Sequence, residues 1–179
     1  SKQSFDGLRS AHIEDYRSLY ERCEIDLGTT PGHLLRLPTR ERLIAYQNAF
    51  AAEAELADRG LEELMYQYAR YLMISCSRPG YGAMAANLQG LWLTRKRPPW
   101  RCDYHTDINL QMNYWLTGPS NLHECFIPFA EWVDSIREVR KEETRRVVGV
   151  DKGWLMRSEN GIFGGSTWHI QKGDSAWLC

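Results

Sequence analysis

The feature that most constrains the fold is an apolar stripe between residues 61 and 76. Apolar side chains recur there at spacings of three and four, while polar residues such as Glu62, Gln67 and Arg70 occupy the positions between them. This periodicity places the apolar residues on one face of an α-helix. The stripe comprises Leu61, Leu64, Met65, Tyr68, Ala69, Leu72, Met73 and Cys76. It predicts a helix that packs into a helical core.

Similar spacings elsewhere predict that most of the chain is helical. We expect helices over residues 8–24, 39–58, 108–115 and 121–140, and the first turn of another from Ser175. Gly60 should end the second helix, and Asn121 with Glu124 should form a capping box at the start of the fourth. A short extended piece is expected over 154–156. The fold class is therefore all-α.

The arrangement of these helices suits a helical barrel or toroid. Long segments rich in glycine and proline separate the helices, and loops of this kind at one end of a barrel commonly form a site. A helical repeat solenoid is the alternative, but the sequence has no period near 34 or 40 residues. We therefore favour the barrel.

Charge and composition exclude several classes of partner. The 22 basic and 23 acidic residues nearly balance and form no long basic run, so no nucleic-acid partner is expected. No apolar run approaches eighteen residues and no leader precedes the first helix, so we expect neither a membrane span nor a signal peptide in this sequence. Five scattered cysteines without a Cys-x-x-Cys pair predict mostly buried thiols. The histidines are not clustered in sequence, so we expect no metal site. No cofactor is predicted.

The segment 85–115 carries the clearest functional signal. It gathers tryptophans, tyrosines, a histidine, aspartates and asparagines around a Pro-Pro turn. Aromatic faces beside amide and carboxylate groups are suited to a polyhydroxylated ring, which stacks on one and hydrogen-bonds to the other. Trp92 and Trp115 are expected in the core, whereas Trp100, which follows the prolines, is expected to contact a sugar.

Asp107 and Asn109 form the central polar pair of this segment. A carboxylate and a carboxamide two residues apart are able to hold one water molecule for attack on a sugar carbon. The alternative is that both side chains cap the short helix that follows, since Asp and Asn are favoured caps. Spacing alone leaves both interpretations open.

A set of ordered motifs resembles the catalytic domain of glycoside hydrolase family 95, the inverting α-L-fucosidases and their α-L-galactosidase relatives. The motifs are AH at 11–12, DYR at 15–17, PT at 38–39, ER at 41–42, YARYL at 68–72, SCSRPG at 75–80, ANLQGLW at 86–92, PPW at 98–100, DYHTDINLQMNYW at 103–115, NL at 121–122, EC at 124–125 and AWLC at 176–179. They extend over nearly the whole chain.

The resemblance implies part of an (alpha/alpha)6 barrel, with residues 1–58 as a preceding helical linker and 59–179 as the first part of the barrel. Asp107 and Asn109 would position the attacking water, assisted by a distant aspartate. His105 would contact the sugar of the substrate, a fucosylated glycan or oligosaccharide. Trp100 and Asn113 are the other candidate substrate-binding residues of the segment. Family habit suggests a secreted or periplasmic protein.

Three departures from the family pattern matter. Asp107 stands where many members have asparagine, so it is able to polarise the water itself. The loop 157–165 lacks the paired histidines and the tryptophan of many relatives, and Glu159 reaches a pocket only if this loop folds inward. The family's general acid is a glutamate expected beyond Cys179, so we expect the isolated chain to have little or no activity.

The leading hypothesis is an exo-acting glycosidase that removes terminal α-L-fucose with inversion. An α-L-galactosidase is the close alternative, because the two sugars differ only by a hydroxyl at carbon six. From other classes, a non-catalytic carbohydrate-binding helical domain and a helical protein-interaction module remain alternatives. A pocket beside His105 would argue against the interaction module.

Overall fold

The computed structural model describes residues 3–53, 58–80, 82–93, 95–166, 168–171 and 173–178, and it is mostly helical. The α-helices are α1 (Phe5–Tyr20), α2 (Gly32–Leu35), α3 (Thr39–Ala51), α4 (Arg59–Cys76), α5 (Asn109–Tyr114), α6 (Ile127–Val148) and α7 (Asp174–Leu178). Single 3-10 turns occur at Pro99–Cys102, Trp115–Thr117 and His123–Phe126. Strand β1 (Tyr104–His105) pairs antiparallel with β2 (Glu159–Asn160). The predicted all-α class is confirmed.

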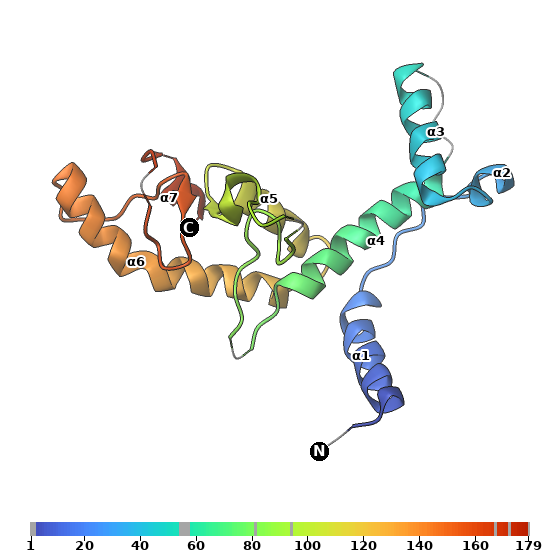
Figure 1. The fold of residues 1–179 in the computed structure, drawn as a ribbon, viewed down its shortest axis with the longest axis horizontal. Helices are drawn as coiled ribbons and strands as arrows, with labels where there is room; N and C mark the ends of the chain where they lie inside the picture. The colour runs from blue at the N-terminus through green and yellow to red at the C-terminus, as the bar shows by residue number, and fades with distance from the viewer. Residues whose placement is uncertain are drawn as a thin grey trace.

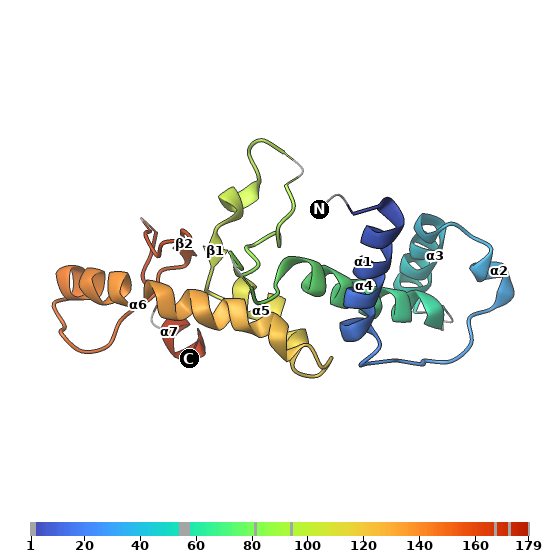
Figure 2. The ribbon, with the colours of Figure 1, turned by 90° about the horizontal axis from the view of Figure 1, so that it is seen from below.

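Helix α4 links two groups of elements (Figures 1 and 2). Helices α1 and α3 pack against α4 at one end of the molecule, whereas α5, α6, α7 and the strand pair gather at the other. No helix of the described residues is both long and apolar enough to cross a membrane. The closed barrel and the boundary at residue 58 remain predictions.

The predicted stripe forms α4, but Gly60 lies inside this helix and does not end the preceding one. Asp58 is the N-cap of α4 and accepts a hydrogen bond from the Leu61 amide at 3.1 Å. The Gly60 amide donates to Thr30 Oγ1 at 2.6 Å, and a Cβ at this position would approach the same oxygen to 3.0 Å. Glycine therefore allows a close approach to Thr30, and α3 already ends at Ala51.

Arg70, which the periodicity places on the polar face of α4, is completely buried. Its guanidinium donates to the main-chain oxygens of Leu19, Tyr20 and Cys23 at 3.0, 2.8 and 2.9 Å. The last carbonyls of a helix lack partners within the helix, so a cation at this end both satisfies and stabilises them. Arg70 therefore fastens the end of α1 to α4.

The capping box predicted at Asn121 and Glu124 is wrong. Asn121 has a left-handed backbone (φ 56°), and the Glu124 carboxylate instead pairs with Arg22 Nη1. A 3-10 turn follows, and α6 begins at Ile127 with a proline in its first turn. Helix α6 ends at Gly149, whose φ of 78° is the usual left-handed termination. No strand is assigned at 154–156, where a short extended piece was expected; Arg157 next to it forms an isolated bridge with Ile170, and β2 lies at Glu159–Asn160.

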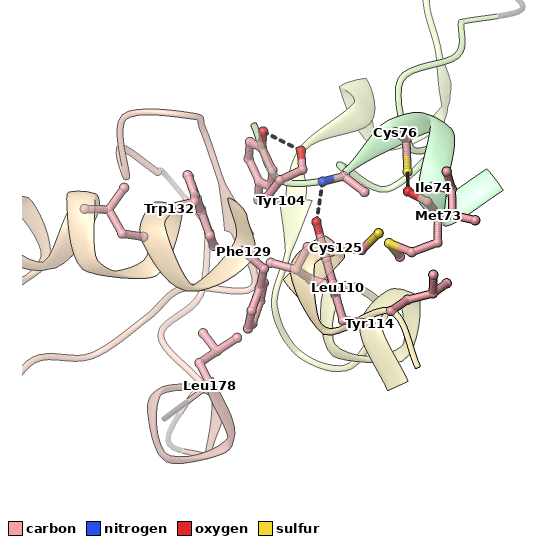
Figure 3. Packing of buried hydrophobic residues seen from close by; sticks show 14 of the residues in the cluster. Met73, Ile74, Cys76, Tyr104, Leu110, Tyr114, Cys125, Phe129, Trp132 and Leu178 are labelled. Atoms are coloured by element: carbon pink, nitrogen blue, oxygen red, sulfur yellow. Dashed lines mark hydrogen bonds between the residues drawn. The ribbon is translucent and has the colours of Figure 1, made fainter. Parts of the chain in front are cut away.

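Two buried tyrosines fix the long loop before β1 to the core (Figure 3). The Tyr114 hydroxyl accepts from the Ala86 amide at 2.7 Å, and the Tyr104 hydroxyl donates to the Ala85 oxygen at 3.1 Å. The Tyr104 ring also stacks on Trp132 of α6, with centroids 4.5 Å apart. These contacts hold the loop and β1 against α6, and so position the residues that follow.

Trp92 and Trp115 are largely exposed, so their predicted place in the core is wrong. The Trp92 ring lies so close to Gly90 that a Cβ there would meet it at 2.6 Å, which leaves the outer face of the ring uncovered. Trp115 pairs with Trp177 at a centroid distance of 6.3 Å on the surface. Both rings therefore pack against a neighbour and still remain exposed.

The described cysteines are free thiols. Cys76 and Cys125 are buried, as predicted, whereas Cys23 and Cys102 are half-buried, and Cys179 lies outside the described residues. Burial raises the pKa of Cys76 and of Cys125 to about 11. Both thiols therefore remain protonated and act as small apolar groups.

Candidate active site

A cavity of about 630 Å³ opens where the loop before β1 meets β2. Its walls include Trp100, Asp103, Glu159, Asn160, Ile162 and Ser166. Aromatic, acidic, amide and hydroxyl groups therefore line one space large enough for a monosaccharide unit. The protein-interaction alternative predicted no pocket around His105, so this cavity argues against it.

Pairing of the two short strands brings the 157–165 loop into this site. His105 lies opposite Glu159, and Tyr104 lies opposite Asn160. Because directly opposite residues in a strand pair project to the same face, His105 and Glu159 lie on one side. The loop thus folds inward, and Glu159 reaches the cavity wall.

Asn160 holds this arrangement from the buried side. Its side chain is 1% exposed, and Nδ2 lies within hydrogen-bond distance of the Tyr104 oxygen (3.2 Å), Thr106 Oγ1 (3.1 Å) and the Arg157 oxygen (2.6 Å). The Asn160 amide group therefore joins β1 and Thr106 to the 157–165 loop. Sequence spacing gave no indication of this role.

The backbone at Trp100–Cys102 is strained. Trp100, Arg101 and Cys102 all have left-handed φ angles of 51°, 57° and 53°, and this conformation costs non-glycine residues roughly 1–2 kcal/mol each. The turn directs the Trp100 ring toward His105, with centroids 5.4 Å apart, and leaves the indole 57% exposed. Trp100 therefore offers an open aromatic face at the cavity.

His105 lies between two carboxylates. Its Nδ1 is 3.0 Å from Asp103 Oδ2, and its Nε2 is 3.4 Å from Asp107 Oδ1. Burial raises the pKa of Asp103, although the hydrogen bond from His105 opposes this effect. Asp103 thus orients the imidazole and leaves Nε2 facing Asp107.

Asp103, His105 and Glu159 each offer one atom within a span of 4.8 Å, a separation that a metal ion is able to bridge. The Nδ1 of His105 is already engaged by Asp103, so the geometry is that of a hydrogen-bonded imidazole and carboxylate rather than a ligand set. The absence of a metal cofactor remains a prediction.

Asp107 and Asn109 do not cap the following helix. The N-cap of α5 is Ile108, and no side chain makes a capping hydrogen bond there. One oxygen of Asp107, Oδ1, is buried without a hydrogen-bond partner, and Asn109 is exposed at the first position of α5. The capping alternative is therefore wrong, and both side chains keep free polar atoms.

Asn113 lies apart from the cavity that Trp100 lines. Its Nδ2 donates to the main-chain oxygen of Asn87 at 3.1 Å, and its side chain contributes to a different cavity beside Trp92. Trp100, His105 and Asp107 thus form one contiguous group, Asn109 lies two residues beyond it, and Asn113 supports the loop.

Asp174 is a site residue that the sequence did not reveal. It begins α7, is 5% exposed, and lies 3.4 Å from Thr106 Oγ1. Burial and the charge of Asp107 raise its pKa to about 6. Its distance from Asp107 along the chain left no spacing signal that would have identified it.

Comparison with known proteins places the chain in a family. Residues 4–179 match the model of the glycosyl hydrolase family 95 catalytic domain. A probable alpha-fucosidase A of Aspergillus niger is 33% identical over 185 residues, covering 99% of this chain and 22% of that protein. Alpha-L-fucosidase 2 of Arabidopsis thaliana is 33% identical over 188 residues, covering 99% and 21%.

A probable alpha-fucosidase A of Aspergillus oryzae is 34% identical over 162 residues, covering 90% of this chain and 21% of that protein. The chain thus spans about a fifth of the length of these relatives. Because the family model covers nearly every residue, this chain belongs to the glycosyl hydrolase family 95 catalytic domain.

Proposed function

We propose that the protein is a glycoside hydrolase that removes terminal α-L-fucose from glycans with inversion, and that this chain supplies the groups that hold the attacking water. The observation that carries the proposal is that Asp107 Oδ1 is buried and makes no hydrogen bond among the described residues, although His105 Nε2 lies 3.4 Å from it. Leaving such an atom unpaired costs about 1–3 kcal/mol. A bound water or sugar hydroxyl would remove that cost.

In the proposed reaction, Asp107 and Asn109 together bind the attacking water. The carboxylate of Asp107 accepts a proton from the water, and the carboxamide of Asn109 fixes its orientation. Inverting enzymes place base and acid roughly 6.5–9.5 Å apart, with the water between the base and the sugar carbon. The family resemblance assigns the acid to a glutamate beyond Cys179, so the isolated chain would show little or no turnover.

The sugar would lie against the exposed face of Trp100. His105 lies beside Trp100, with ring centroids 5.4 Å apart, and its Nε2 is directed to Asp107, since Asp103 engages the other ring nitrogen. Apolar stacking on one side and hydrogen bonds on the other are the usual means of binding a hexose. Asn113, which contacts Asn87, would support the site from behind.

Glu159 favours an α-L-galactosidase as the second candidate. Its carboxylate lines the cavity and would accept a hydrogen bond from a hydroxyl at carbon six, which fucose lacks. A site that hydrogen-bonds a hydroxyl rejects the analogue without it strongly, whereas an apolar pocket discriminates less. The preference for α-L-galactoside over α-L-fucoside would thus depend on Glu159.

The test uses the complete polypeptide that contains this chain, with chromogenic α-L-fucoside and α-L-galactoside substrates. Asn109→Ala and Asp107→Ala should each lower kcat by at least about a hundredfold, the usual size of a lost acid–base or water-holding contact. Asp151→Asn, an exposed control, should leave kcat unchanged. NMR of the first product anomer reports inversion. Binding of fucose without any turnover would instead favour the non-catalytic carbohydrate-binding domain.

A further inference from the structure

Asp174 is buried, and it makes no short hydrogen bond to the part of the chain that the structure describes. Among these residues its partner is Thr106 Oγ1 at 3.4 Å, but that hydroxyl already donates to the Arg157 oxygen at 2.7 Å. A single hydroxyl hydrogen serves one strong acceptor. The Asp174 carboxyl is therefore not explained as an acceptor for Thr106.

Stabilisation of α7 does not explain Asp174 either. An acidic side chain in the first turn of a helix is favoured by the helix dipole and has no need to be buried. Asp174 is buried, and the environment favours its neutral form, which is the opposite of what a helix-stabilising carboxylate would show. Another interaction must account for its position.

Two charged or titratable groups act on Asp174. Asp107, which precedes α5, disfavours ionisation of Asp174, and His105 of β1 favours it, while burial is the largest influence. Thr106 lies between them in sequence and is fully buried, with its amide bound to the Ser158 oxygen at 2.9 Å. The main-chain oxygen of Thr106 also accepts a hydrogen bond from the Gln111 side chain at 2.6 Å. Thr106 is thus a rigid link between Asp174 and the two neighbouring site residues.

We propose that Asp174 is a positioning residue for Asp107, whose charge and contact with Thr106 set the basicity and placement of the water-holding carboxylate. This inference rests on the proposed function. When Asp174 is neutral, its hydroxyl is able to donate to Thr106 Oγ1, and Asp107 is the only negative charge of the pair. When Asp174 loses its proton, the second charge makes Asp107 a stronger base.

The first test is the pH profile of the complete polypeptide and its Asp174→Asn variant, which keeps the shape of the side chain but cannot ionise. The pKa of Asp174 is about 6, so the ratio of variant to parent kcat should fall about three- to tenfold between pH 5 and pH 7.5. KM should change little, because Asp174 does not line the cavity. A ratio that is constant across this range would overturn the proposal.

The second test needs no turnover. In protein labelled with ¹³C at aspartate carboxyls, one resonance should titrate near pH 6 and be absent from Asp174→Asn. In Asp107→Asn the same inflection should move to lower pH, because a like charge has been removed, and in Asp134→Asn, an exposed control, it should not move. An inflection that stays in place in Asp107→Asn would refute the coupling.

The two tests separate the inference from the proposed function. A shifted inflection in a protein that hydrolyses neither substrate would overturn the hydrolase proposal and leave the coupling of the two carboxyls intact. Hydrolysis with an unshifted inflection would overturn the role of Asp174 and leave the hydrolase proposal intact. A shifted inflection with a pH-dependent ratio would support both.

Discussion

Replacing Arg70 with methionine should detach α1 from α4. The guanidinium makes three hydrogen bonds to main-chain oxygens at the end of α1 and just beyond it, and it is completely buried. Bonds to a charged donor contribute about 1.5–3 kcal/mol each, so their loss costs at least about 4.5 kcal/mol. Methionine of similar length recovers roughly 1.5 kcal/mol through apolar burial. The net loss is therefore about 3 kcal/mol.

Urea unfolding followed by circular dichroism measures this loss, and hydrogen exchange localises it. We expect faster exchange at the amides of α1 than at those of α6, since the guanidinium of Arg70 bonds the end of α1 and makes no hydrogen bond to the described residues of α6. Arg9→Met, on the exposed face of α1, is the matched control and should change the unfolding free energy by less than about 0.5 kcal/mol. If Arg70→Met costs less than about 1 kcal/mol, or exchange rises equally in α1 and α6, the fastening role of Arg70 is refuted.

Three further predictions concern Asp58, Asn160 and Glu159. The hydrogen bond from Arg42 holds the pKa of the Asp58 carboxyl below its usual value, so its contribution to stability is present above about pH 4 and is lost as the pH falls below that value. Asp58→Asn should therefore flatten the loss of stability at low pH in unfolding experiments. Asn160→Ala should destabilise the strand pair by about 1–3 kcal/mol, seen as faster exchange at the Thr106 amide, and unchanged exchange there would contradict its role. Glu159→Gln should change the ratio of kcat/KM for galactoside and fucoside at least about fivefold, and an identical ratio would remove Glu159 from sugar selection.

Local periodicity predicted the helices whose apolar residues form one continuous face. The stripe at residues 61–76 became α4 because apolar spacing describes contacts within about one turn of the chain. Periodicity failed at Gly60 and at Asn121, where distant groups decided the local conformation. The Thr30 hydroxyl packs closely on residue 60, where a Cβ would approach it to 3.0 Å, and Arg22 engages the glutamate that was expected to cap α6.

The sequence by itself determined the helical class, the family resemblance and the polar segment from Asp103 to Asn109. Only the tertiary structure decided that Glu159 faces His105, that Arg70 is buried and that Asp174 lies beside Thr106. The contacts involved, such as Arg70 with Leu19 and Asp174 with Thr106, join residues that are about fifty positions or more apart in the chain. A helical repeat records neighbours three or four residues away, whereas contacts across such separations are fixed by how whole elements pack, which no single-sequence pattern encodes.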